Sequence, residues 1–312
     1  MNSNIAKSQE RSKAIKWIFP FLIFIFCAVW IVANQSLIRK SIENSLKLCL
    51  SSIIPAIFPF MILSEYITSS ISVKSDSKWL GSFKKTFSIC GIGVIPFLIG
   101  NVCGFPLGAQ ITKKLYDKEC ISKEEYERLL PLCSNPSFAF VVSGVGGGMR
   151  GSIFDGVMLY TAILMATVIS GIIWKRNNSA SNFYGYLDDS VFSLSSSIKS
   201  SAQSCIYVSA YIIFFSTLAG WIEYINIPRT ISLILVSLLE IGTASSLISR
   251  ELSDPCISLS LTAFSLGFSG ISVYMQSLCF SPSGVKNRYY IKMKLTEGII
   301  ASAIMFLIYN LI

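Results

Sequence analysis

The sequence contains no histidine and few charged residues. The absence of histidine excludes imidazole-based catalytic triads, zinc sites with histidine ligands and the usual side chain for proton shuttling. Asp, Glu, Lys and Arg make up 14% of the 312 residues, whereas soluble domains average about 25%. With 52% hydrophobic residues and a mean hydropathy of +0.61, the composition predicts an integral membrane protein. The missing histidine argues against an enzyme, and we expect no cofactor.

The sequence also gives little indication of a metal site or a nucleotide-binding site. None of the nine cysteines forms a C-x-x-C pair, and most lie in apolar segments, so we expect small apolar side chains rather than disulfides or metal ligands. Gly146, Gly148 and Gly151 match G-x-G-x-x-G, but no strand precedes them. The match therefore does not predict a nucleotide-binding loop.

Several apolar stretches have the roughly 20 residues that a bilayer crossing requires. The first, Trp17–Ala33, follows a basic start without a small-residue cleavage site, so we interpret it as a retained helix rather than a signal peptide. The other predicted spans are 48–68, 131–149, 152–174, 193–222, 256–280 and 291–311. Segments 87–110 and 230–249 are interrupted by small and polar residues and are predicted to be re-entrant hairpins.

The basic residues orient these predicted spans. With seven crossings and a cytoplasmic N-terminus, nineteen of the 26 lysines and arginines fall in cytoplasmic segments and six outside, while Lys199 lies at the edge of a span. This bias satisfies the positive-inside rule. It explains the net charge of +9 without a nucleic-acid partner.

The two halves of the chain show a weak but ordered similarity. Residues 45–64 align with 197–216, 104–111 with 240–247, and 139–147 with 263–270. Three crossings separate the starts of the halves, so the halves would point in opposite directions. Many secondary transporters use such an inverted repeat to build a site at the midplane of the membrane.

The predicted fold is therefore all-α, with each half built as span, re-entrant hairpin, broken span and span. The predicted divisions are an N-terminus, first transmembrane helix and linker (1–44), a first repeat (45–174), a cytoplasmic linker (175–192) and a second, inverted repeat (193–312).

The stretch IGNVCGFPLGAQIT, residues 99–112, places helix breakers and amides inside an apolar segment. Gly104 and Gly108 allow close backbone approach, and Pro106 frees a carbonyl. Asn101 and Gln110 offer amide hydrogen bonds. We interpret these five residues as substrate contacts, because irregular backbone at membrane depth is tolerated where it lines a wet cavity. The alternative is a G-x-x-x-G packing face between helices.

Glu240 is preceded by nine mostly apolar residues. An ionisable group at that depth is costly, so we predict that Glu240 binds a coupling ion, carries a proton or hydrogen-bonds the substrate; the alternative is a carboxylate at the mouth of a hairpin. Asn135 precedes a proline that breaks a predicted span as it starts. The remaining candidate substrate contacts are Thr243, Ser245, Gly267 and Ser269. No metal site is predicted, and Arg150 and Lys199 are the nearest candidate cations for an anionic substrate.

One segment has the pattern of a soluble helix. In ISKEEYERLL, residues 121–130, Ser122 and Glu125 form a capping-box pattern, and Tyr126, Leu129 and Leu130 share one face. We predict a short helix along the cytoplasmic surface, and a solvated linker helix is the alternative.

The segment GFPLGAQITKKLYDKECISKEEYERLLPLCSNPSFAFVVSGVGGGM resembles sporulation integral membrane proteins of the YlbJ type. Those proteins share a G-x-P-x-G-A turn, an I-x-x-E-E-x-x-R-L-L linker helix and a C-N-N-x-x-P-like start of the next span. In this sequence that start reads Cys133-Ser134-Asn135-Pro136, which is one residue shorter. LLEIGTAS and GFSGISVYMQ look like the matching second-half motifs. The likeness runs from about residue 45 to the end of the chain.

That family is grouped with nucleoside-recognition, or Gate, domains, whose layout is similar to concentrative nucleoside transporters. The resemblance implies hairpins and broken helices around a substrate site, and a spore-forming bacterium. In that setting the expected cargo is dipicolinate, a small planar dianion. The expected location is a bacterial cell membrane, with the outer forespore membrane as one candidate.

Three functions follow as hypotheses. The first is a transporter or facilitator of a small solute, either an organic anion such as dipicolinate or a nucleoside. The second is a membrane scaffold for spore assembly that moves nothing. The third, an intramembrane enzyme, would have to work without histidine and without a G-x-S-x-G motif. The expected partners are the small solute, the lipid bilayer and either a second copy of the chain or other sporulation proteins.

Overall fold

The computed structural model describes residues 25, 28–70, 78–176, 193–225, 227–283, 285 and 287–311. Within these ranges the chain forms helices joined by turns, without a strand. The all-helical prediction is therefore confirmed for the described part of the chain. Most of the predicted first span, Trp17–Ala33, and most of the linker 175–192 lie outside the described residues.

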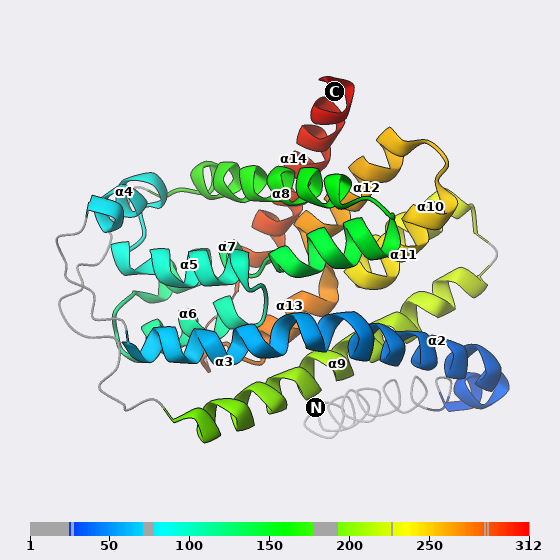
Figure 1. Cartoon of the computed structure of the whole chain (residues 1–312), viewed down its shortest axis with the longest axis horizontal. Helices are drawn as coiled ribbons and strands as arrows, with labels where there is room; N and C mark the ends of the chain where they lie inside the picture. Colours follow the sequence, from blue (N-terminus) through cyan, green and yellow to red (C-terminus); the bar gives the residue numbers. More distant parts are fainter. Residues whose placement is uncertain are drawn as a thin grey trace, which may run out of the picture.

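The first half contains one long interrupted helix followed by shorter ones (Figure 1). Its elements are α2 (Gln35–Leu48), η1 (Cys49–Ile53), α3 (Ile54–Ser70), α4 (Lys78–Phe87), η2 (Gly91–Gly93), α5 (Val94–Val102), α6 (Leu107–Asp117), α7 (Lys123–Leu132), η3 (Phe140–Met149) and α8 (Ile153–Ile173). The segments η1 and η3 are π-helical.

The described part of the second half consists of α-helices. They are α9 (Leu194–Tyr224), α10 (Arg229–Leu239), α11 (Ile241–Glu251), α12 (Pro255–Phe268), α13 (Gly270–Leu278) and α14 (Tyr290–Leu311). In Figure 1 the α5–α6 pair lies toward the end of the molecule that holds α4, and the α10–α11 pair lies toward the opposite end. The last helix, α14, packs mainly on α12 and α8 and so joins the two halves.

Among the described residues, three helical segments are long and apolar enough to cross a membrane: Ile153–Ile173, Leu194–Tyr224 and Pro255–Leu278. They agree with three of the predicted spans. The pair Leu80–Phe87 and Gly91–Val102 would be a fourth if counted as one span, but it is bent by 93°. These apolar segments support the prediction of an integral membrane protein, and the remaining predicted spans stay predictions.

Two helix pairs occupy the predicted hairpin segments. We call α5, residues 103–106 and α6 hairpin one, and α10 and α11, which meet at Glu240, hairpin two. Two interruptions occupy the predicted broken spans. We call residues 133–137 the first break and the left-handed pair Ser269–Gly270 (φ +68° and +71°) the second break.

Each hairpin lies against the break of its own half. In the first half, a Cβ added to Gly104 (φ +83°) would lie 2.6 Å from the Ser137 nitrogen. In the second half, a Cβ added to Gly270 would lie 2.9 Å from the Leu239 carbonyl oxygen. Both contacts are so close that only glycine fits without displacing backbone. Hairpin and break therefore form one packed unit in each half.

Glycines also bring each broken span against the helix that comes after it. A Cβ on Gly146 of η3 would lie 2.5 Å from Gly156 Cα of α8. A Cβ on Gly267 of α12 would lie 3.1 Å from Gly298 Cα of α14. The first glycine of the G-x-G-x-x-G match therefore marks a helix crossing, where small residues allow backbones to approach.

The linker helix forms as predicted but lies in a different environment. Ser122 caps α7 by accepting from Glu125 N, and the Glu125 carboxylate accepts from Ser122 N, so the capping box is complete. However, Tyr126, Glu125 and Arg128 are all buried. The prediction of a helix along the surface was wrong, because the polar residues of α7 face protein groups. Arg128 donates to the carbonyls of Phe87 and Ser88 at the end of α4.

Glu125 offers a direct test of this buried contact. Its Oε1 accepts from Cys90 N at 2.7 Å and its Oε2 from Ser122 N at 2.8 Å. Glu125→Gln replaces one acceptor with an N–H₂ donor that faces a backbone N–H. We expect the variant to lose about 1–3 kcal/mol of stability, measured as a lower unfolding temperature of the purified protein. Glu124→Gln is the control, because Glu124 is half-exposed and its ion pair with the half-exposed Arg176 is long, at 3.7 Å. Equal effects of the two changes would contradict the prediction.

Candidate functional site

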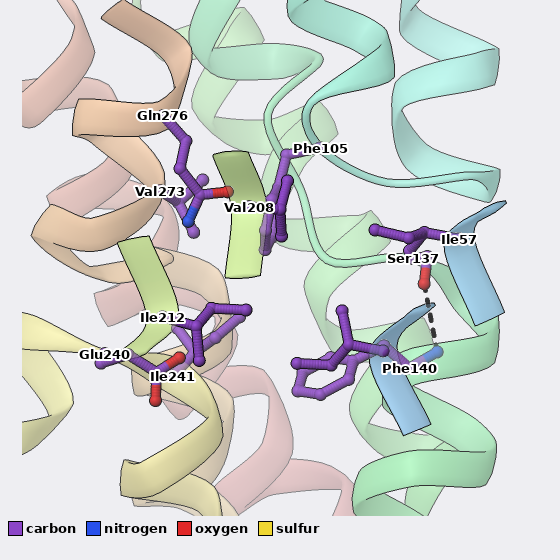
Figure 2. Close-up of a pocket in the computed structure, with 11 residues that line it drawn as sticks. Ile57, Phe105, Ser137, Phe140, Val208, Ile212, Glu240, Ile241, Val273 and Gln276 are labelled. Carbon is purple, nitrogen blue, oxygen red and sulfur yellow. Dashed lines mark hydrogen bonds between the residues drawn. The ribbon is translucent and has the colours of Figure 1, made fainter. Parts of the chain in front are cut away.

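Both hairpins and both broken spans contribute to one pocket (Figure 2). Hairpin one supplies Phe105, the first break supplies Ser137, hairpin two supplies Glu240, and the helix after the second break supplies Gln276. The full set of lining residues is Ile53, Ile57, Phe105, Ser137, Phe140, Val208, Ile212, Glu240, Ile241, Val273 and Gln276. The cavity volume is about 30 Å³, which holds one or two waters rather than an organic solute.

Glu240 is buried at the point where α10 ends and α11 begins. Its carboxylate caps α11 by accepting from Gly242 N at 2.9 Å and from Thr243 N. These bonds and the positive end of the helix stabilise the negative charge in an apolar wall. The carboxylate keeps lone pairs that neither backbone group uses.

Gln276 is the second polar side chain of the wall, and it is 2% exposed. Its Nε2 donates to Ser272 Oγ at 3.2 Å, whereas its Oε1 has no hydrogen-bond partner in the described protein. A buried acceptor without a donor is costly unless water or a ligand supplies one. Together with Glu240, it makes the polar part of the pocket rich in acceptors.

The predicted site residues of hairpin one do not line this pocket. Gly108 packs on the first break, where an added Cβ would lie 2.1 Å from Cys133 O. Pro106 follows a cis peptide bond and precedes α6. Gln110 donates to Ser204 Oγ of α9 at 3.0 Å. Gly104 and Gly108 therefore match the alternative interpretation, in which these glycines form a packing face.

The predicted residues of the second half, except Glu240, also lie outside the pocket lining. Thr243 hydrogen-bonds Ser216 of α9 at 2.9 Å, and Ser245 is buried with its hydroxyl unpartnered in the described protein. Ser269 donates to Ser134 O of the first break at 3.3 Å. Gly267 lies at the crossing with α14. Glu240 alone among the eleven predicted residues lines the pocket.

The two cations considered for an anionic substrate do not face the pocket. Arg150 forms an ion pair with Asp155 at 3.2 Å and donates to Ser258 Oγ at 2.9 Å. Lys199 is exposed on α9. Neither supplies a free positive charge to the pocket lining.

A second polar cluster connects hairpin one with the first break, α8 and α14. Asn135 of the first break donates to Asn101 Oδ1 at 2.7 Å and to Thr167 Oγ1 at 3.0 Å. Thr167 of α8 donates to Glu297 Oε1 at 2.8 Å, and Lys294 pairs with Glu297 at 3.1 Å on α14. All five side chains are buried. The structure thus brings together two predicted residues, Asn101 and Asn135, but as part of a cluster that the sequence did not predict.

Lys294 and Glu297 were missed for a specific reason. The charge count placed Lys294 in a cytoplasmic segment and so treated it as a topology signal, whereas its side chain is 0% exposed in the structure. The pair was visible as opposite charges three residues apart at the start of an apolar run. Such i,i+3 pairs share a helix face and can enter a membrane together.

Comparisons with known proteins give one informative match. The chain is 23% identical over 334 aligned positions to the sporulation integral membrane protein YlbJ of Bacillus subtilis (strain 168). The alignment covers 92% of this chain and 81% of the relative. No family model and no solved structure matches. The chain is thus an integral membrane protein whose described part is all-helical, and it is similar, over most of its length, to a membrane protein of sporulation.

Proposed function

We propose that the chain is a transporter or facilitator of a small solute that acts during spore formation. One observation carries the proposal: two hairpins and two broken helices meet at a single buried pocket that holds a carboxylate. Interrupted helices at membrane depth are tolerated where they line a solute path, and a pure scaffold does not require them. The similarity to a sporulation membrane protein supports the setting.

The repeated contacts support an inverted repeat as part of this proposal. Each half has the order long helix, hairpin, interrupted helix and long helix, and each hairpin packs on its own break through glycine. A two-fold relation in the membrane plane would make each half face the opposite side. The pocket between the halves would then open to one side at a time. Because the cavity now holds only water-sized molecules, a solute requires a more open arrangement of the hairpins.

Two solute classes fit different parts of the site. An organic anion such as dipicolinate would use the N-termini of α6 and α13, neither of which has a side-chain cap. A nucleoside would present N–H and O–H donors to Glu240 and to the unpartnered Oε1 of Gln276. The anion is the first candidate because it fits the sporulation setting, and the nucleoside is the alternative favoured by Gln276.

Solute efflux from proteoliposomes tests the proposal. We expect the purified protein to release labelled dipicolinate or a labelled nucleoside. If the solute is a nucleoside, Glu240→Gln should slow release at least about tenfold, the effect of losing about 1.4 kcal/mol of interaction with its donors. If the solute is dipicolinate, the change removes a like charge and should not slow release. Glu43→Gln is the control, because Glu43 is 59% exposed and pairs with exposed Arg39. If neither solute moves in any imposed ion gradient, the transport proposal fails and a scaffold role replaces it.

A further inference from the structure

Lys294 lies at a site of oxygen acceptors that is closed to solvent. Its ammonium donates to Glu297 Oε2 at 3.1 Å and to Asn135 Oδ1. The lysine and glutamate side chains are 0% and 1% exposed. No residue outside this cluster forms a described salt bridge with either charge.

The acceptors are held in place by neighbours from other elements. The Asn135 side chain is oriented by its donation to Asn101 of hairpin one and to Thr167 of α8. Thr167 also donates to Glu297, which fixes the second carboxylate oxygen. A carboxylate and an amide oxygen presented in this way form the kind of oxygen site that binds a hard cation.

We propose that the Lys294 ammonium is a tethered cation that fills this oxygen site in place of a free monovalent ion. It carries the single positive charge that neutralises Glu297, and it reaches the interrupted backbone of the first break through Asn135. The chain thereby holds hairpin one, the first break and α14 together whatever salt surrounds it. This inference does not depend on solute transport.

Removal of the ammonium should convert this site into one that a free cation can enter. Lys294→Ala leaves the Glu297 carboxylate without a countercharge and opens space where the side chain lay. Sodium is small enough to enter that space and supplies one positive charge. We therefore expect Lys294→Ala to unfold at a lower temperature than the unchanged protein in choline chloride, and to gain at least about 2 °C when sodium replaces choline at equal ionic strength.

Three further measurements make the test decisive. The unchanged protein should unfold at the same temperature in sodium, potassium and choline salts, and a sodium-specific rise there would overturn the proposal even if the variant fails to fold. Lys294→Ala/Glu297→Gln should show no sodium response, because its site lacks the negative charge. Ethylammonium should stabilise Lys294→Ala as sodium does. A Lys294→Ala protein that responds to neither ion would show that Lys294 is only a structural partner of Glu297.

Discussion

Replacing Lys294 by methionine is expected to lower the unfolding temperature of the purified protein by about 5–8 °C. The substitution keeps an unbranched side chain of similar length but leaves the Glu297 carboxylate charged and enclosed. Removing one partner of a buried ion pair typically costs about 3–5 kcal/mol, far more than losing an exposed pair. The measurement is thermal unfolding in detergent, followed by tryptophan fluorescence.

The double variant Lys294→Met/Glu297→Gln separates charge from packing. It contains no ion at the site, and the glutamine can still accept from Thr167 and donate to Asn135. We expect it to be more stable than Lys294→Met alone, although it carries one more substitution. If the double variant loses as much as the sum of the two single changes, the pair contributes through packing and the electrostatic explanation is wrong.

The second large effect is expected at the glycines that contact the first break. A Cβ on Gly108 would lie 2.1 Å from Cys133 O and 2.8 Å from Gly100 Cα, and both are backbone atoms that cannot rotate away. Gly108→Ala should therefore separate hairpin one from the break. We expect a loss of about 3 kcal/mol or more and little folded protein at elevated temperature, measured by size-exclusion chromatography after heating.

Gly81 is a matched control for this substitution. It lies inside α4, and a Cβ there would meet nothing within 4 Å. Gly81→Ala should be neutral or stabilise the protein by up to about 1 kcal/mol, because alanine favours a helix interior. If the two alanine variants behave alike, the close approach of hairpin one to Cys133 is not a constraint on folding.

The positions at which the helices are interrupted could be predicted from the sequence. Glycine, proline and asparagine in residues 99–112, the Asn135-Pro136 step and the apolar approach to Glu240 all marked positions where the chain is interrupted. These signals are local, since the backbone preferences of such residues act on their own neighbours. The capping box at Ser122 was predictable for the same reason.

The partners of buried polar groups could not be predicted in this way. A capping box predicts where α7 begins, but not that Arg128 binds carbonyls at the end of α4, 40 residues earlier. Glycines at Gly104, Gly108 and Gly267 fit either a substrate contact or close packing, and only the neighbouring backbone distinguishes them. Phe105, Ser137 and Gln276 reach the pocket because four interruptions from different parts of the chain meet there.

The glycine crossings have a mechanical consequence. Where Gly146 meets Gly156, and where Gly267 meets Gly298, two helix backbones approach so closely that a Cβ on the first glycine would lie 2.5 Å and 3.1 Å, respectively, from the Cα of the second. Neither crossing can take a larger residue unless a helix moves. A side chain added at either glycine would push the broken span away from the helix beside it. The pocket wall that the broken span carries, Phe140 in the first half and Gln276 in the second, would move with it.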